Sequence, residues 1–502
     1  MKLCSAEQTR ALEALYRDRL GLPLFALMEA AGGAVARAVL ELEPTSVLVL
    51  AGKGNNGGDG LCCARRLRDA GVPVEVRLIG KLGELKGDAL LAARAFEAHG
   101  GRIRAQSAHL PLAGEAGLVI VDALLGTGLG RAPEGPIAKA ISRIERARAQ
   151  GAKVVAIDVP SGLNADTGHA PGVCVTADVT ATFAPLKLGL CMDGALDRIG
   201  RLEVSEIGIP VALLDEVGGT SVETVDLPAL AGRVGVRPRA AFKNTFGHVL
   251  AVGGSPGKTG AIGMTALAAL RMGAGLVTVA GRADEVHAAQ ALSPTLMSAP
   301  LSGTGPLGPD DLDALLEAAE GKQALVMGPG LARGAKTRAL ILALVEKSGL
   351  PAVLDADALN ALGLAPKLGA RVVMTPHPGE AGRLLGLETA AVQRDRSAAA
   401  RQLARTTGAT VVLKGAHTLI ASGDSLWLND SGDARLATAG AGDVLAGMVA
   451  ALLARDVLVS RDAAALAVAL HASLPEVFPD RATLIATDLI EAIPLALRKA
   501  GL

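Results

Sequence analysis

Residues 46–60 read "SVLVLAGKGNNGGDG", an apolar run that passes directly into a loop with five glycines, two asparagines and one acid. The Val and Leu residues predict a buried β-strand, and "LCCARRLRDAG" (61–71) predicts a helix closed by glycine. Glycine costs about 0.5–1 kcal/mol relative to alanine inside regular structure, so this loop indicates a close approach to its backbone. Two interpretations stay open: its N–H groups meet a phosphate or sugar edge, or Asp59 caps a tight turn.

The same alternation of apolar strands and helices runs through both halves of the chain, and is typical of parallel sheets covered on both faces. The first half also begins with a long helical segment, roughly residues 5–40, and Gly, Pro and acids interrupt the pattern near 218–224. We therefore predict two α/β domains, residues 1–218 and 225–502. The predicted strands lie within residues 46–52, 72–80, 117–126, 152–162 and 178–185 of the first half, and within 248–254, 275–281, 324–330, 351–357, 371–379, 410–422 and 425–430 of the second.

The composition excludes several classes of protein. Lys+Arg and Asp+Glu are equal at 50 each among 502 residues, which gives no electrostatic attraction to nucleic acid or membranes. Five cysteines without metal-ligand spacing indicate a reducing compartment, and neither a signal peptide nor a membrane-spanning run is predicted. We expect a soluble cytoplasmic protein, with no nucleic acid and no membrane as partner.

In the first half, "GNNGGDG", "DALLGTG" and "DVPSG" each follow a predicted strand. Ligands of parallel sheets gather at the carboxyl ends of strands, so these loops predict one pocket. Asp158 is a candidate for proton transfer, and the alternative is an Asx-type turn before Pro160. Asp122, Ser161 and an Asn side chain could offer oxygens to a cation. Because no acid closes the strand at 72–80, an ordinary Rossmann dehydrogenase is rejected.

In the second half, "GGSPGKTG" (253–260) fails as a phosphate-binding Walker loop, because Val252 stands where glycine is required. A stronger signal is "ATAGAGDVLAGMVAALLA" (437–454), in which a glycine-rich turn opens a helix with Asp443 in its first turn. Helix amides would hold phosphoryl oxygens while Asp443 removes a proton; the alternative is a helix cap. "TPHPGE" (375–380), "LKGAHTLIA" (413–421) and "DADALN" (355–360) follow other strands, and the last could help with metal or start a helix at Asp357.

Taken together, these motifs resemble the family of bifunctional NAD(P)H-hydrate repair enzymes. That family fuses an NAD(P)H-hydrate epimerase of Rossmann-like three-layer α/β/α fold to an ADP- or ATP-dependent NAD(P)H-hydrate dehydratase of ribokinase-like α/β/α fold. The resemblance covers nearly the whole chain. "GNNGGDG", "DALLGTG" and "DVPSG" match the epimerase half, and "HVLAVGGS", "GPG", "DADALN", "TPHPGE", "KGAHT" and "GAGDVLAG" match the dehydratase half, all in order. One position departs from the family pattern: Ala441 stands where Thr is frequent.

The resemblance implies a role for each matching residue. Asp158 and Asp443 would be catalytic. The hydrated dinucleotide would be bound in the first domain by Asn55, Asn56, Gly57, Gly58, Asp59, Gly126, Thr127, Gly128, Leu129, Gly130, Arg131 and Asp158. In the second domain it would be bound by Ala261, Gly330, His377 and Asp443. The adenine nucleotide would be bound by Lys414, Gly415, Ala416, His417, Thr418 and Gly442. A K⁺ ion would be bound by Asn56, Asp122 and Ser161.

The implied activity is the repair of NADHX and NADPHX, nicotinamide coenzymes hydrated at C6 of the ring. The first domain would interconvert the R and S epimers. The second would dehydrate the S epimer with ADP, or ATP, and Mg²⁺, giving NAD(P)H, AMP and phosphate. Relatives imply a homo-oligomer, a tetramer or larger. The alternative prediction is a ribokinase-like vitamin-precursor kinase fused to a non-catalytic binding domain.

Overall fold

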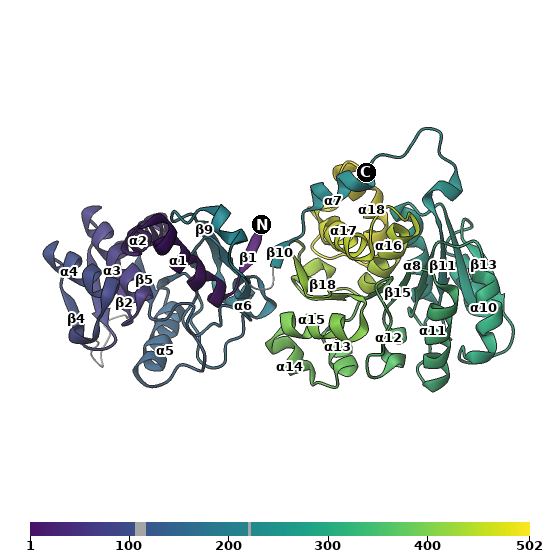
Figure 1. The fold of residues 1–502 in the computed structure, drawn as a ribbon, viewed down its shortest axis with the longest axis horizontal. Coiled ribbons are helices and arrows are strands. Elements are labelled where there is room, and N and C mark those ends of the chain that lie inside the picture. The colour runs from purple at the N-terminus through teal and green to yellow at the C-terminus, as the bar shows by residue number, and fades with distance from the viewer. Residues whose placement is uncertain (106–116, 219–221) are drawn as a thin grey trace. The chain divides into compact units, whose positions relative to one another are not determined.

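The computed structural model describes residues 1–105, 117–218 and 222–502. The chain forms two compact units, Met1–Ser221 and Val222–Leu502 (Figure 1). The predicted boundary at 218–224 overlaps residues 219–221, which lie outside the described residues. In the described part of the chain, no helix combines the length and apolar character needed to span a membrane.

The first unit is built on a seven-stranded, all-parallel sheet in the order β4-β3-β2-β5-β6-β7-β9. Its strands are β2 (Ser46–Ala51), β3 (Val74–Leu78), β4 (Ile103–Ala105), β5 (Leu118–Ala123), β6 (Lys153–Ile157), β7 (Val179–Phe183) and β9 (Arg201–Ser205). Two short strands outside it, β1 (Lys2–Cys4) and β8 (Leu186–Lys187), pair in parallel. The helices are α1 (Ala6–Leu20), α2 (Phe25–Leu40), α3 (Asn55–Asp69), α4 (Gly87–Ala98), α5 (Gly135–Ala149) and α6 (Asp193–Ile199).

Alternate residues of each strand enter different cores, which makes the unit a three-layer sandwich. In β2, Val47 and Val49 pack with α2, α3 and α4 on one face. Leu48 and Leu50 pack with α5 on the other face. Because both faces are covered, the central strand β2 is buried from Val47 to Ala51, and the predicted α/β/α fold is confirmed for this unit.

The predicted helical segment at 5–40 is wrong in one respect, because it forms two helices. Ser5 accepts from the Gln8 amide and so caps α1 at its start. Gly21, at φ 66°, ends α1 with a left-handed residue, and the chain then restarts at α2.

The second unit has a ten-stranded sheet in the order β13-β12-β11-β14-β15-β16-β17-β18-β19-β10. Its strands are β10 (Val222–Thr224), β11 (His248–Val252), β12 (Leu276–Arg282), β13 (Met297–Leu301), β14 (Ala324–Met327), β15 (Ala352–Leu354), β16 (Val372–Met374), β17 (Thr410–Leu413), β18 (Thr418–Ser422) and β19 (Ser425–Asn429). Its helices are α7 (Leu227–Val234), α8 (Thr259–Met272), α9 (Ala283–Gln290), α10 (Leu312–Ala319), α11 (Ala335–Ser348), α12 (Asp357–Leu362), α13 (Pro378–Leu385), α14 (Thr389–Arg394), α15 (Arg396–Thr407), α16 (Ala441–Ala454), α17 (Ser460–Ser473) and α18 (Ala486–Lys499).

In the second unit, α8, α16, α17 and α18 cover one face of the sheet, and α10 to α15 lie on the other (Figure 1). Helices α8 and α16 touch closely, because a Cβ at Gly447 would lie 2.1 Å from the Thr265 carbonyl oxygen. The predicted strand at 410–422 is wrong as a single strand. It folds into β17 and β18, an antiparallel pair whose turn carries residues 414–417.

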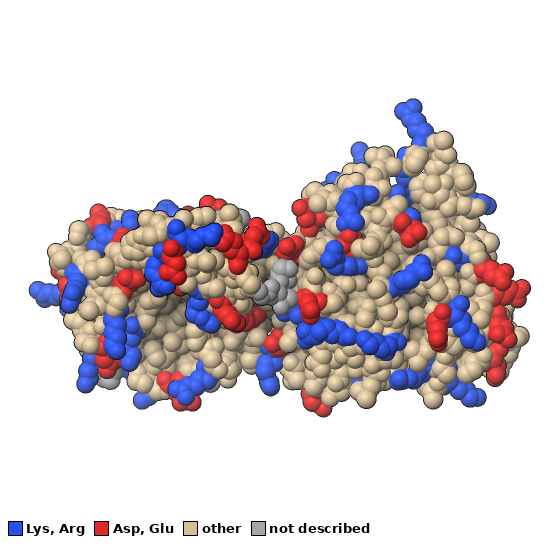
Figure 2. Space-filling view, in the orientation of Figure 1, with Lys and Arg blue, Asp and Glu red and all other residues tan. Residues whose placement is uncertain are grey.

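Acidic and basic side chains are interspersed over the face of each unit that Figure 2 shows. This mixture agrees with the equal numbers of acidic and basic residues in the sequence.

Candidate active sites

The glycine loop of the first unit lies against the protein itself at most of its positions. A Cβ at Gly57 would lie 2.0 Å from the Gly52 carbonyl oxygen, and one at Gly60 would lie 2.5 Å from the Ala123 Cβ. At Gly58 the methyl group of Met28 would be 2.6 Å away, whereas a Cβ at Gly54 would meet open space. The glycines therefore let the start of α3 sit tightly on β2 and the loop after β5.

Asp59 does not cap this helix. Helix α3 begins at Asn55, with Gly54 as its N-cap, so Asp59 is its fifth residue. Its side chain instead lines a cavity of about 830 Å³. The interpretation of Asp59 as a helix cap is therefore wrong, because the helix starts five residues earlier than a cap at Asp59 requires.

Loops at the carboxyl ends of the parallel strands form this cavity together with α1 and α2, as the strand-end rule predicts. Of the predicted site residues, the cavity is lined by Asn55, Asn56, Asp59, Gly126, Thr127, Gly128 and Asp158. Gly57, Gly58, Leu129, Gly130 and Arg131 are not among its lining residues. Gly58 is buried, and its amide donates to the Gly54 carbonyl in the first turn of the helix. This amide is therefore already paired within the protein.

A cluster of oxygen atoms adjoins the cavity around Asp122, which is fully buried. The Ser161 hydroxyl and amide donate to its two carboxylate oxygens at 2.6 Å and 2.8 Å. The side-chain amide of Asn56 donates to the Leu125 carbonyl at 2.9 Å, and the Ser161 hydroxyl donates to the same carbonyl at 3.2 Å. Burial raises the pKa of Asp122 to about 6, although the hydrogen bonds from Ser161 and Leu124 oppose this.

Asp158 lies directly after β6 and receives two side-chain donors on one carboxylate oxygen. The Thr182 hydroxyl donates to Oδ1 at 2.9 Å, and the Lys187 ammonium donates to Oδ1 at 2.5 Å. Asp158 adopts a left-handed backbone with φ 62°, which is uncommon outside glycine and is concentrated at functional sites.

Lys187 and Glu13 are two charged residues of this cavity that the sequence motifs did not reveal. Lys187 stands in the apolar run "FAPLKLGLC" (183–191). The one feature of the sequence that could have pointed to a functional role is this single cation within an apolar run. Burial, reinforced by Asp158 and Glu13, raises the pKa of Asp59 well above its usual range, and Lys187 opposes this. Burial also raises the pKa of Glu13.

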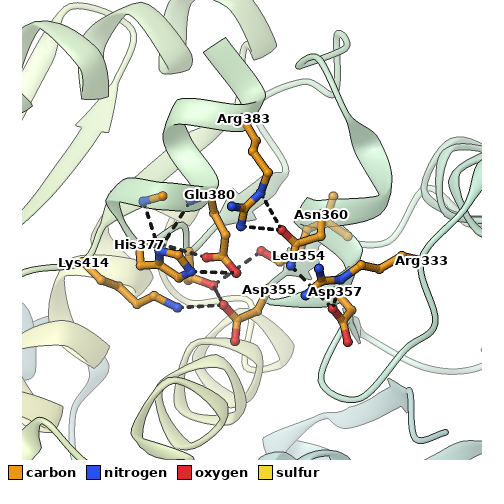
Figure 3. A network of polar contacts seen from close by, with 11 residues as sticks. Arg333, Leu354, Asp355, Asp357, Asn360, His377, Glu380, Arg383 and Lys414 are labelled. Carbon is orange, nitrogen blue, oxygen red and sulfur yellow. Dashed lines mark hydrogen bonds and ion pairs between the residues drawn. The ribbon is translucent and has the colours of Figure 1, made fainter. Parts of the chain in front are cut away.

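In the second unit, Asp355 follows β15 and is buried under two donors. Lys414 donates to Oδ1 at 3.0 Å (Figure 3). Thr375 donates to the same atom at 2.7 Å. Burial lowers the pKa of Lys414, but the surrounding carboxylates, Asp355 first, outweigh it and the net shift is upward. Lys414 therefore stays a cation at the centre of this site.

The first turn of α16 lies beside this pair. A Cβ at Gly442 would lie 3.3 Å from the Lys414 ammonium and 3.9 Å from an Asp355 oxygen. Asp443 is the third residue of the helix and Gly440 is its N-cap, so the interpretation of Asp443 as a cap is wrong. Burial, with a further contribution from Asp355, raises the pKa of Asp443 to about 7, and Lys414 opposes this. The helix amides, a cation and a carboxyl that titrates near neutrality thus meet at one place.

A second polar cluster surrounds Asp357, the first residue of α12. Lys258 and Arg333 donate to its two oxygens at 2.8 Å and 2.7 Å. These two cations lower the pKa of Asp357 despite its burial. Asp357 therefore does start its helix, and its oxygens are already occupied by cationic side chains.

His377 caps α13, because its Nδ1 accepts from the Gly379 amide at 3.0 Å. This hydrogen bond assigns the ring proton to Nε2 in the neutral histidine. Burial, with Lys414 next, lowers the pKa of His377. The half-exposed ring thus offers an N–H donor beside Glu380 (Figure 3).

The remaining predicted residues lie around these clusters. The Thr265 hydroxyl contacts the backbone carbonyls of both Ala261 and Asp443 at 3.1 Å, which ties α8 to α16. Gly330 has φ 71°, and a Cβ at this position would lie 2.5 Å from the Lys258 carbonyl oxygen. Residues 415–417 form the turn between β17 and β18, and Thr418 begins β18.

Arg396 holds the turn from both ends. Its guanidinium donates to the Leu413 and His417 carbonyls at 3.2 Å and 2.9 Å. Gly415 and Ala416 are exposed between these anchors. The turn at residues 414–417 is therefore held in place at both ends and exposed at Gly415 and Ala416.

Within the described residues, no group of three or more His, Cys, Asp and Glu side chains could hold a metal ion. The Asn56, Asp122 and Ser161 cluster offers oxygen atoms of mixed types, which are ligands that hard cations accept.

Comparisons with known proteins match both units. The model of the YjeF-related protein N-terminus matches residues 24–189, and the model of NAD(P)H-hydrate dehydratase matches residues 249–495. The bifunctional NAD(P)H-hydrate repair enzyme Nnr of Moorella thermoacetica is 38% identical, covering 99% of this chain and 97% of that one. The enzyme of the same name from Escherichia coli is 38% identical, covering 97% and 92%. The structure of a hypothetical protein from Streptococcus mutans, at 28% identity and a TM-score of 0.50, covers 56% of this chain and 100% of that one.

Proposed function

Because the chain belongs to the family of bifunctional NAD(P)H-hydrate repair enzymes, we propose that it returns hydrated nicotinamide coenzymes to NADH and NADPH in two steps. The first unit interconverts the R and S epimers at C6 of the hydrated ring. The second unit dehydrates the S epimer and consumes ADP, which leaves AMP and inorganic phosphate.

The dehydration step uses Asp443. Its ionised carboxylate takes the proton of the C6 hydroxyl while that oxygen attacks the terminal phosphoryl group of ADP, and the bond to AMP breaks. The phosphate then leaves C6 with its bonding electrons, the ring nitrogen supplies an electron pair, and loss of a proton from C5 forms the ring double bond. Lys414 and the amides of the first turn of α16 stabilise the phosphoryl oxygens. The pKa of about 7 supports this role, because a base works best near the operating pH.

The nucleotide would occupy the fixed turn at residues 414–418, with its phosphates toward Gly442 and Lys414. Mg²⁺ is usually held by one or two carboxylates and by substrate phosphates. Here Asp355 is engaged by Lys414 and Asp357 by Lys258 and Arg333. A bound Mg²⁺ would therefore be held chiefly by the nucleotide, where it neutralises phosphate charge. His377, Ala261 and Gly330 would contact the hydrated coenzyme.

The epimerisation step uses Asp158 for proton transfer in the cavity of the first unit. K⁺ fits the adjoining cluster, because Asp122 is a fully buried carboxylate whose hydrogen-bond donors are neutral groups. Asn56, Asp122 and Ser161 would hold the ion and so fix the loops that carry Asn55 and residues 126–128. This would orient the dinucleotide over Asp158.

The observation that carries the proposal is the meeting of Asp443, Lys414 and Asp355 at the N-terminus of α16. The test is to incubate the purified chain with separated R-NADHX and S-NADHX, each with ADP, and to follow the absorbance of NADH. We expect recovery from both epimers. Asp443→Ala should abolish recovery from both, and Asp158→Ala should abolish recovery from the R epimer alone. A persistent phosphorylated product without NADH would refute the proposal.

The same assay with ATP in place of ADP decides the nucleotide preference, and size-exclusion chromatography tests the predicted tetramer or larger assembly. We expect AMP and phosphate in equal amounts with ADP. Formation of AMP without NADH would contradict the coupling of the two.

A further inference from the structure

Lys187 is a buried cation in the cavity of the first unit, and its side chain is only 3% exposed. Its ammonium donates to Asp158 Oδ1 and, at 3.0 Å, to the Phe183 carbonyl. Burying an ammonium costs several kcal/mol unless it is paired and hydrogen-bonded. A lysine kept in this place at such a cost indicates a role for its charge and not only for its packing.

The geometry at Asp158 distinguishes its two oxygens. Thr182 and Lys187 both donate to Oδ1, and none of the described hydrogen bonds reaches Oδ2. The left-handed backbone of Asp158 is held in turn by its amide, which donates to the Ala181 carbonyl at 2.8 Å. The carboxylate is therefore clamped through Oδ1, and Oδ2 is the oxygen left for a molecule in the cavity.

The charges around Asp158 make the clamp necessary. Glu13 from α1 and Asp59 from α3 line the same cavity and repel the Asp158 charge, while Lys187 from β8 attracts it. The remaining contact is the neutral hydroxyl of Thr182 from β7. Arg10 and Lys53 also line the cavity, but Lys187 is the cation that hydrogen-bonds to Asp158, so its removal would leave Asp158 beside Glu13 and Asp59 without that partner.

We propose that Lys187 is a positioning residue for epimerisation, which pairs with Asp158 Oδ1 and orients the carboxylate so that Oδ2 takes the proton of the C6 hydroxyl. The C6–N1 bond then opens with its electron pair left on N1, C6 becomes an aldehyde carbon, and Oδ2 passes the proton to N1. Reclosure on the other face of C6 reverses these transfers and gives the other epimer. This inference rests on the proposed epimerase function of the first unit. Lys187 would act in epimerisation through its contact with Asp158, and it would have no part in the dehydration step.

The test compares Lys187→Met and Lys187→Arg in the full chain. R-NADHX with ADP measures epimerisation followed by dehydration, and S-NADHX measures dehydration alone. We expect Lys187→Met to lower kcat for the R epimer by about 10²-fold or more, since a correctly placed proton-transfer group contributes about 10²–10⁴-fold. KM should change little, and the rate from the S epimer should match the wild type. The acid limb of the residual R-epimer rate should move to higher pH, and Lys187→Arg should restore part of kcat.

Lys153→Met is the matched control, because it removes an exposed lysine–aspartate pair, with Asp178, at the start of β6. It should leave both rates unchanged.

Wild-type kcat in Lys187→Met, or a loss of kcat with an unchanged pH profile and no rescue by arginine, would overturn the inference. If Lys187→Met fails to fold, Thr182→Val tests whether the donors at Asp158 Oδ1 matter for epimerisation. A several-fold loss of kcat at unchanged KM supports the positioning of Asp158 through Oδ1, and an unchanged kcat overturns it. Failure of the wild type to convert the R epimer would refute the epimerase function itself.

Discussion

Replacing Asp443 by asparagine is expected to stabilise the second unit of the protein while it abolishes coenzyme repair. Burial first, and the charge of Asp355 next, raise the pKa of this carboxyl from 3.8 to about 7. The folded protein thus disfavours the charged form that catalysis requires. Asparagine keeps the shape of the side chain and carries no charge, so the variant escapes this cost.

The sign and size follow from linkage between protonation and folding. Below the unfolded pKa the carboxyl is protonated in both states and contributes nothing. As the pH rises toward the folded pKa, the unfolded chain loses the proton first, so stability falls; above the folded pKa the full cost is present. Each pKa unit is about 1.4 kcal/mol, which makes the cost about 4 kcal/mol at about pH 8 and about 2 kcal/mol at about pH 5. The advantage of the variant should therefore grow by about 2 kcal/mol between these two conditions.

Denaturant unfolding followed by tryptophan fluorescence measures this difference. Trp427, the single tryptophan of the chain, lies in β19 and therefore reports on the second unit. Asp313→Asn is the matched control, because Asp313 is an exposed acid in the first turn of α10. Its replacement should give no stabilisation that grows with pH, since a charged acid at a helix N-terminus is favourable.

An Asp443→Asn variant that is no more stable than the wild type at about pH 8, or whose advantage is the same at both pH values, would refute the reasoning. It would mean that the carboxyl ionises freely in the folded protein.

Four further predictions concern the pH dependence of dehydration, the K⁺ response, the glycine loop and the turn between β17 and β18. The rate of dehydration of the S epimer should rise with pH through about 7, in step with ionisation of Asp443, and an acid limb near the ordinary aspartate range would contradict this. Asp122→Asn should lower epimerisation in K⁺ to the wild-type rate measured without K⁺, while S-epimer dehydration is unchanged; a retained K⁺ response would place the ion elsewhere. Gly57→Ala, whose Cβ would meet backbone at 2.0 Å, should destabilise the first unit by about 1–3 kcal/mol, whereas Gly54→Ala meets open space and should cost less in thermal unfolding. Arg396→Met should raise the KM for ADP several-fold with little change in kcat, since it releases both ends of the nucleotide turn; an unchanged KM would show that the turn is held without it.

The predicted family, activity and α/β fold class are confirmed by relatives that match nearly the whole chain. The assigned roles of individual residues stay predictions, but the convergence of several of them could be anticipated. Asn56, Asp59, Asp122 and Asp158 follow or end parallel strands, and the carboxyl ends of such strands share one edge of the sheet.

Other features could not be anticipated from a linear pattern. Lys187 lies 29 residues after Asp158, in a run without a motif. The run at 410–422 is apolar at both ends, so periodicity alone does not show the reversal between β17 and β18. The partner of Lys187 is distant in sequence, and the turn between β17 and β18 is held by Arg396, which lies outside the run.

The sequence by itself determined where most of the strands and the glycine turns occur, because hydrophobic periodicity and glycine's backbone freedom act over a few neighbouring residues. Only the tertiary structure decided what each of these positions meets. The glycines after β2 accommodate the protein's own backbone and side chains, and Asp59 faces a cavity instead of closing a helix. Asp443 titrates near neutrality because folding buries it beside Asp355, a charge 88 residues away in the chain, and such electrostatic and packing partners exist only once the chain has folded.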